Sequence, residues 1–203
     1  MNEKPILFNA EMVNAILSGR KTQTRRIMGN QPAGQDLETV HVRHNDDFNF
    51  QWYGNLGESS YFPCPLGKPG DQLWVRECFS DLEDFDFFNP SVPDVISGYW
   101  YWADGNPEWG NWTKPKPSIH MPRRASRINL LITGVRVERL QDISDLDCCD
   151  EGYNGPAVTA DNQWPSITWY ERLWDSIYGQ KEGENWQANP WVWVINFERM
   201  EAK

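Results

Sequence analysis

The chain has 203 residues, 14% of them aromatic, and a formal net charge of −10. This length suits one domain with a substantial core, and the aromatic content excludes a disordered or fibrous chain. No apolar run approaches the roughly 18 to 20 residues of a membrane span, and the first residues do not resemble a secretory signal. We therefore expect one cytoplasmic domain over residues 1–203, and the acidic total disfavours nonspecific coating of nucleic acid.

Apolar residues at three- and four-residue spacing predict a first helix that begins after Asn9 as N-cap and ends near Gly19. Residues 29–70 contain frequent Gly, Pro, Asn and Asp without a sustained period, which indicates a long irregular insertion. A strand is predicted over residues 71–77, with Glu77 at its end on the inward face.

Residues 80–117 form a second expected insertion, acidic at first and then aromatic, in which the run from Tyr99 to Trp102 contributes a strand. The alternation from Ile128 predicts another strand, and Gly134 marks a bulge within it. Ser144 with Asp147 forms a capping box for a short helix that ends near Gly152.

Another helix is predicted over residues 166–179, and a last strand over 191–197, where Trp191, Trp193, Ile195 and Phe197 alternate with Val192, Val194 and Asn196. Strands joined by irregular connections favour a mixed α/β (α+β) fold, a partly open β-barrel with flanking helices, over regular βαβ winding.

The cysteines predict neither a disulfide framework nor a metal centre. Cys64, Cys78, Cys148 and Cys149 include no CxxC pair, and two are adjacent, so we expect reduced thiols. His41 and His44 could face one metal ion, but no further cysteine or histidine is suitably spaced nearby. A surface loop is expected there, with no metal and no other cofactor.

Two segments without acidic residues hold much of the positive charge. The first basic segment, residues 20–26, contains Arg20, Lys21, Arg25 and Arg26. The second basic segment, residues 114–127, contains Lys114, Lys116, Arg123, Arg124 and Arg127. They form either one surface for a polyanion or two solvated loops.

Five motifs in order along the chain resemble the ASCH family of the PUA-like superfamily: SGRKTQTRR, GDQLWVRE, PSIHMPRRASRINLLITGVRVERLQDIS, LWDSIYG and NPWVWVINFER. The similar proteins are common in phages and prophages and are sometimes labelled phage morphogenetic proteins. The resemblance implies a PUA-like β-barrel and recognition of RNA or modified bases. Some smaller ASCH proteins are amidohydrolases that remove the acetyl group of acetylcytidine, and others have been connected with RNA cleavage.

The amidohydrolases carry a lysine and a threonine in a turn and a glutamate from a later strand, and Lys21, Thr24 and Glu77 match these positions. The chain departs from them by its two insertions, and from similar phage proteins by Arg124, where an aromatic residue is common. Amide cleavage needs a nucleophile, a base and an oxyanion donor, and Lys21 acts as a base only when neutral. The alternative is a structural Lys21–Glu77 ion pair, with Thr24 serving as a strand residue.

Guanidinium groups near one turn suit phosphate recognition. The expected nucleic-acid-binding residues are Arg20, Arg25, Arg26, Arg76, His120, Arg123 and Arg127. Rings in periodic elements should be buried, namely Trp169, Trp174, Trp191 and Trp193. Rings in the insertions are candidates for base stacking, namely Trp52, Tyr53, Trp100, Trp102, Trp109 and Trp112.

The sequence thus predicts a protein that binds RNA, a nucleotide or a modified nucleoside in a basic cleft, without a membrane partner. One alternative is an amidohydrolase or ribonuclease that uses Lys21, Thr24 and Glu77. The other is a phage–host protein-interaction module whose acidic loop, residues 81–94, contacts a partner. An enzyme should present a ligand-sized pocket, a binding module an open groove, and an interaction module an exposed apolar patch.

Overall fold

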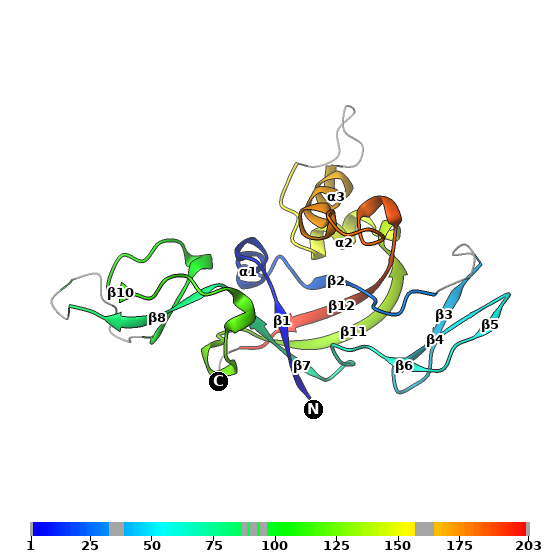
Figure 1. Ribbon diagram of the computed structural model, residues 1–203, viewed down its shortest axis with the longest axis horizontal. Helices are drawn as coiled ribbons and strands as arrows, with labels where there is room; N and C mark the ends of the chain where they lie inside the picture. The colour runs from blue at the N-terminus through cyan, green and yellow to red at the C-terminus, as the bar shows by residue number, and fades with distance from the viewer. Residues whose placement is uncertain are drawn as a thin grey trace.

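The computed structural model describes residues 2–32, 39–86, 89, 93, 97–156 and 165–201. Its centre is a five-stranded sheet in the order β1-β7-β11-β12-β2 (Figure 1). The strands are β1 (Glu3–Leu7), β2 (Gln23–Ile27), β7 (Gln72–Arg76), β11 (Asn129–Arg139) and β12 (Trp191–Arg199). β1 runs parallel to β7, and the other neighbours are antiparallel. Because β1 and β2 are its edges, the sheet does not close into a complete barrel.

The three strands predicted from alternation are confirmed as the neighbours β7, β11 and β12. The predicted bulge is confirmed as well, since the register between β11 and β12 shifts between Ile132 and Gly134. The edge strands β1 and β2 were not predicted. β2 reads QTRRI, a polar run without alternating hydrophobicity, so its place in the sheet depends on partners outside the strand.

The main helices are α1 (Ala10–Leu17), α2 (Asp145–Asp150) and α3 (Pro165–Tyr178), and all three were predicted. The Asn9 side chain caps α1 by accepting from the Met12 N–H, and Ser144 with Asp147 forms the capping box of α2. Short 3-10 turns are η1 (Trp102–Asp104), η2 (Ser118–His120), η3 (Arg123–Ala125), η4 (Leu140–Asp142) and η5 (Trp186–Ala188). The mixed α/β class is therefore confirmed.

The first insertion is not irregular, which corrects the expectation for residues 29–70. It contains β3 (His41–His44), β4 (Asn49–Gly54), β5 (Gly57–Glu58) and β6 (Phe62–Pro63). Phe50 packs edge-on against Trp193, with ring centroids 4.8 Å apart. Trp52 does the same against Trp191 at 5.0 Å, so it is a core residue and not a stacking candidate. The insertion folds because its apolar side chains join the main core.

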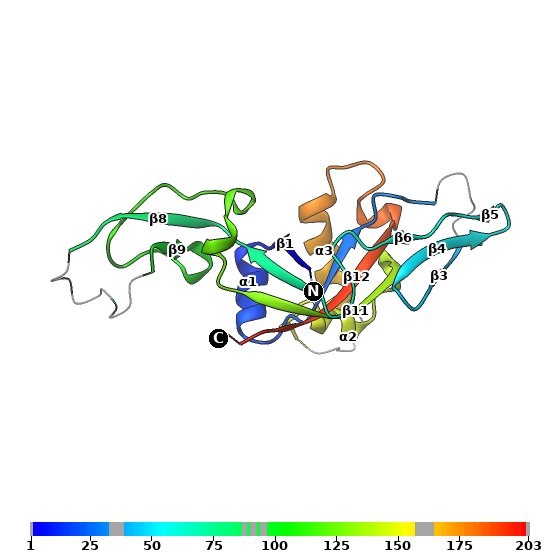
Figure 2. The same cartoon turned by 90° about the horizontal axis from the view of Figure 1, so that it is seen from below.

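The second insertion forms a separate sheet in the order β10-β8-β9. Its strands are β8 (Phe79–Asp84), β9 (Tyr99–Tyr101) and β10 (Asn111–Trp112), so the strand expected from Tyr99 is confirmed. Figures 1 and 2 show this sheet at one end of the molecule and the first insertion at the other. Of the predicted acidic loop 81–94, all residues after 86 except 89 and 93 lie outside the described residues.

The main sheet is packed on both faces. α1 and the first insertion share one core cluster with Trp193, Ile195 and Phe197 of β12, whereas α2 and α3 pack against Val192 and Val194 of the same strand. The alternation predicted for β12 is therefore confirmed, because alternate residues of the strand face different core clusters. From Trp191 to Ile195 both faces of the strand are apolar. Among the described residues, no helix has the length and apolar character needed to cross a membrane.

Candidate functional site

A tight turn carries the chain from α1 into β2. Gly19 has a φ of +75°, a conformation that glycine adopts without steric cost. The backbone N–H groups of Arg20 and Lys21 both donate to the carbonyl of Ala15. This turn directs the Lys21 side chain into the interior, beside the end of α2.

Lys21 is paired with Glu151, the C-cap residue of α2, and not with Glu77. Its ammonium group contacts the Glu151 carboxylate and donates to the Glu151 carbonyl at 3.0 Å. Both side chains are almost fully buried. Burial lowers the pKa of Lys21, although Glu151 opposes this by favouring the ammonium ion. Lys21 therefore forms a buried ion pair, as the structural alternative predicted, but its partner is Glu151 and not Glu77.

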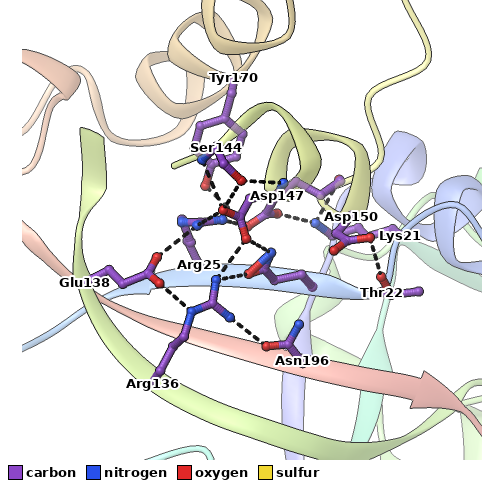
Figure 3. Close-up of polar contacts among 12 residues, drawn as sticks. Lys21, Thr22, Arg25, Arg136, Glu138, Ser144, Asp147, Asp150, Tyr170 and Asn196 are labelled. Carbon is purple, nitrogen blue, oxygen red and sulfur yellow. Dashed lines mark hydrogen bonds and ion pairs between the residues drawn. The ribbon is translucent and has the colours of Figure 1, made fainter. Parts of the chain in front are cut away.

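Arg25 lies on β2 with no exposed side-chain surface, among three carboxylates. The closest nitrogen–oxygen distances are 3.1 Å to Glu138, 3.4 Å to Asp147 and 3.6 Å to Glu151. Figure 3 shows Arg25 between Glu138 and Asp147, with Tyr170 of α3 beside them. Two of its nitrogens, Nε and Nη1, have no hydrogen-bond partner within the described part of the chain.

Arg136 of β11 closes this network on the outer side (Figure 3). Its Nη2 donates to Asp147 at 2.8 Å and to Gln23 at 3.0 Å, and its Nη1 donates to Asn196 at 2.8 Å. β2, β11, β12 and α2 are thereby joined by charged and amide groups. The network accounts for much of the polar sequence of β2, because Gln23 bonds to Asp147 and Arg136 and Arg25 pairs with Glu138.

Glu77 follows β7 and belongs to a different ion pair. Arg127 binds it through two hydrogen bonds of 3.0 Å and also binds Asp104 at 2.7 and 2.8 Å. Burial raises the pKa of Glu77, although Arg127 acts in the opposite direction. Lys21 and Glu77 therefore have separate counterions, and the convergence of the predicted trio stays a prediction.

A groove runs between α1 and α3. Its first cavity, of about 450 Å³, includes Glu151 and Trp169 in its walls, and its second, of about 540 Å³, includes Arg26 and Tyr178. A narrow space of about 10 Å³ lies between them and is lined in part by Thr24 and Arg25. Met12 lines all three spaces, while the lining residues on α3 advance from Trp169 to Tyr178. We call this continuous feature the α1–α3 groove.

Two predicted phosphate-binding residues lie on the groove. Arg20 is exposed, lines the first cavity and donates to the Gly152 carbonyl at 2.9 Å. Arg26 lines the second cavity and donates to the Leu7 carbonyl of β1 at 2.7 Å. Neither pairs with a carboxylate among the described residues. Arg25 faces the narrow space from the interior, where acids already neutralise it.

The other four predicted phosphate-binding residues, Arg76, His120, Arg123 and Arg127, do not line this groove. Arg123 is paired with Glu3 at 3.0 Å, and Arg76 lies 4.7 Å from the Trp74 ring. His120 is exposed on η2. The second basic segment reaches the second cavity only through Ser118, and none of its cations lines the groove.

Several groove residues were not predicted from the sequence as site residues. Glu151, Tyr153 and Trp169 line the first cavity, and the two rings lie 5.4 Å apart. Trp169 was expected in the core, but it is only partly buried. Glu151 follows a helix rich in acids, and nothing in that local pattern distinguishes the one carboxylate that meets Lys21.

Comparisons with known proteins give one structural likeness. No protein-family model and no curated protein matches the chain. Among solved structures, the chain is similar to a high-resolution crystal structure of an ASCH domain from Lactobacillus crispatus JV V101. The identity is 15%, the TM-score is 0.36, and the match covers 98% of this chain and 79% of that chain. Any function must therefore be argued from the residues of the groove itself.

Proposed function

We propose that this chain is an ASCH-type protein of the PUA-like superfamily that binds RNA, a nucleotide or a modified base in the α1–α3 groove. The ASCH part of the proposal rests on the five ordered sequence motifs. The binding part rests on one observation: Arg20 and Arg26 line successive cavities, and neither has a carboxylate partner among the described residues. Guanidinium groups left unpaired beside a cavity are suited to phosphate oxygens.

The walls of the groove suit a base as well as a phosphate. The first cavity, at about 450 Å³, falls within the range of roughly 300 to 1,000 Å³ that is usual for small-molecule sites. Tyr153 and Trp169 form an aromatic pair in its wall, and an aromatic face offers a stacking surface to any base. A nucleotide would place its base against these rings and its phosphate near Arg20.

Charge distribution reconciles this binding with the acidic total. Long-range repulsion by a net charge of −10 weakens nonspecific contact with nucleic acid. Binding is then confined to the groove, where Arg20 and Arg26 have no counterion in the part of the chain that the structure describes. We expect short single-stranded RNA or mononucleotides to bind in the groove, and duplexes to bind poorly.

Fluorescence anisotropy with a short single-stranded RNA, measured over a salt titration, tests the proposal. Arg20→Ala and Arg26→Ala should each weaken binding and lower the slope of log K against log salt by about 0.7, the value for one lost phosphate contact on a single strand. Arg123→Ala is the matched control, because Arg123 is already paired with Glu3 and lies off the groove. An RNA affinity that is unchanged by both groove substitutions would contradict the proposal.

A hydrolase is the second candidate, favoured by the burial that lowers the pKa of Lys21. A neutral lysine can take a proton from a nucleophile, and Thr24 lines the narrow part of the groove. Wild-type protein and the Lys21→Ala, Thr24→Ala and Glu77→Gln variants should be compared for hydrolysis of acetylcytidine and cleavage of short RNA. Loss of turnover in folded variants supports catalysis, and a wild type inactive on both substrates removes this candidate.

A further inference from the structure

The narrow middle of the α1–α3 groove holds a buried donor and a buried acceptor that lack good partners. Arg25 lines this space with no exposed side-chain surface, and its Nε and Nη1 donate to no acceptor among the described residues. The closest approach of Arg25 to Glu151 joins Nη1 to Oε1 at 3.6 Å, which is too long for a hydrogen bond.

Glu151 is incompletely satisfied at the same oxygen. Lys21 contacts the other oxygen, Oε2, while Oε1 accepts from the Tyr170 hydroxyl at a long 3.4 Å. Buried polar groups in proteins are nearly always hydrogen-bonded, because an unmet donor or acceptor loses its water without replacement. The pair Arg25 Nη1 and Glu151 Oε1 therefore offers one donor and one acceptor, side by side, to a third group.

We infer that Arg25 and Glu151 recognise the hydrogen-bonding edge of a base inserted into the α1–α3 groove. This inference rests on the proposed function and specifies which part of the ligand the groove recognises. A base edge carries an acceptor next to a donor, as in the carbonyl and ring N–H of uracil. The carbonyl accepts from Arg25, and the N–H donates to Glu151. A phosphodiester has no donor to offer, and its negative charge would meet the Glu151 carboxylate unfavourably.

The surrounding groups are arranged for this orientation. Glu151 lines both the first cavity and the narrow space, so an edge that points inward from the first cavity reaches it. Tyr153 and Trp169 line the first cavity, where the plane of the ring would lie. Arg20 lines the same cavity and is exposed, which suits the phosphate at the opposite end of the nucleotide.

The narrow space is small, at about 10 Å³, which is about the volume that one water molecule requires. A single bound water is therefore the competing occupant, and it would serve the same two groups. The two occupants differ in one consequence. A base edge makes affinity depend on the ring N–H of the ligand, and a permanent water does not.

Isothermal titration calorimetry with three probes tests the inference on wild-type protein. The probes are uridine monophosphate, its N3-methyl derivative and ribose phosphate. Methylation removes the donor and adds bulk at the inserted edge, so we expect at least about tenfold weaker binding than for uridine monophosphate. Equal affinity of the two nucleotides overturns the inference and leaves the proposed function standing. Failure of all three probes to bind overturns the inference, and the RNA titration then decides the proposed function separately.

Two variants provide an independent measurement. Glu151→Ala removes the accepting carboxylate and leaves room for a methyl group, so the affinity ratio between the two nucleotides should fall towards one. Arg20→Ala should weaken all three probes by a similar factor and leave that ratio unchanged. Thermal melting monitors folding of both variants. An unchanged ratio in folded Glu151→Ala overturns the inference, and the probe series on wild-type protein decides the matter if that variant does not fold.

Discussion

The two basic segments look alike in sequence and differ in the structure. In the first, Lys21 and Arg25 turn inward and pair with acids of α2 and β11, while Arg20 and Arg26 stay unpaired with any described carboxylate. In the second, the cations stay nearer the surface, and most meet a partner brought from elsewhere in the chain: Lys116 meets Asp81, Arg123 meets Glu3, Arg124 meets Tyr99, and Arg127 meets Glu77 and Asp104.

The difference shows that the number of cations in a segment does not determine how many of them are free to bind a ligand. Counterions come from positions far away in sequence, such as Glu151 for Lys21 and Glu3 for Arg123. A buried pair fixes the fold around it, because either partner alone would be a desolvated charge. An exposed pair contributes little to stability but removes a cation from ligand binding. Substitutions in each segment test this contrast.

The largest effect is expected at the buried pair of the first segment. Lys21→Met leaves Glu151 buried without its lysine, and Glu151→Leu leaves Lys21 without its acid, so each should lower the free energy of unfolding by about 3–5 kcal/mol. The double variant removes both charges and should cost clearly less than the sum of the single changes. Urea denaturation measures all three. Strictly additive effects would show that the two residues do not act as a pair.

A smaller effect is expected in the second segment, at Arg127. Arg127→Met leaves the Glu77 carboxylate, only 2% exposed, without its two hydrogen bonds, at a cost of about 1–3 kcal/mol in unfolding free energy. Arg124→Ala is the control, because Arg124 is exposed and its removal should leave urea denaturation unchanged. If the two variants were equally stable, the Glu77–Arg127 pair would have no structural role.

The smallest effect concerns acid stability. Burial raises the pKa of Asp147, but hydrogen bonds from Ser144 and the charges of Arg25 and Arg136 outweigh it, so the pKa lies below its usual 3.8. A carboxyl with a lowered folded pKa stabilises the fold above its unfolded pKa and loses that contribution as pH falls through the folded pKa. Asp147→Asn should therefore be less stable than wild type near neutral pH, with the gap narrowing in acid. Denaturation at several pH values measures it, and a gap independent of pH would contradict it.

Local patterns were sufficient for most regular elements. The side-chain cap at Asn9, the capping box at Ser144 and the apolar spacing of α3 act within a few residues, so the sequence specifies these helices directly. The alternation of side chains predicted the strands β7, β11 and β12, and the position of Gly134 predicted the bulge in β11. These are short-range effects that depend only on neighbours along the chain.

Only the tertiary structure decided the rest. β2 is a strand because α2 and β11 supply partners for its buried polar side chains, and Trp52 is core because β4 lies against Trp191. The choice of Glu151 over Glu77 as the acid for Lys21 has the same origin. Burial and ion pairing depend on which distant segments meet, so residue types alone could identify Lys21 and Thr24 as candidates but could not assign their partners.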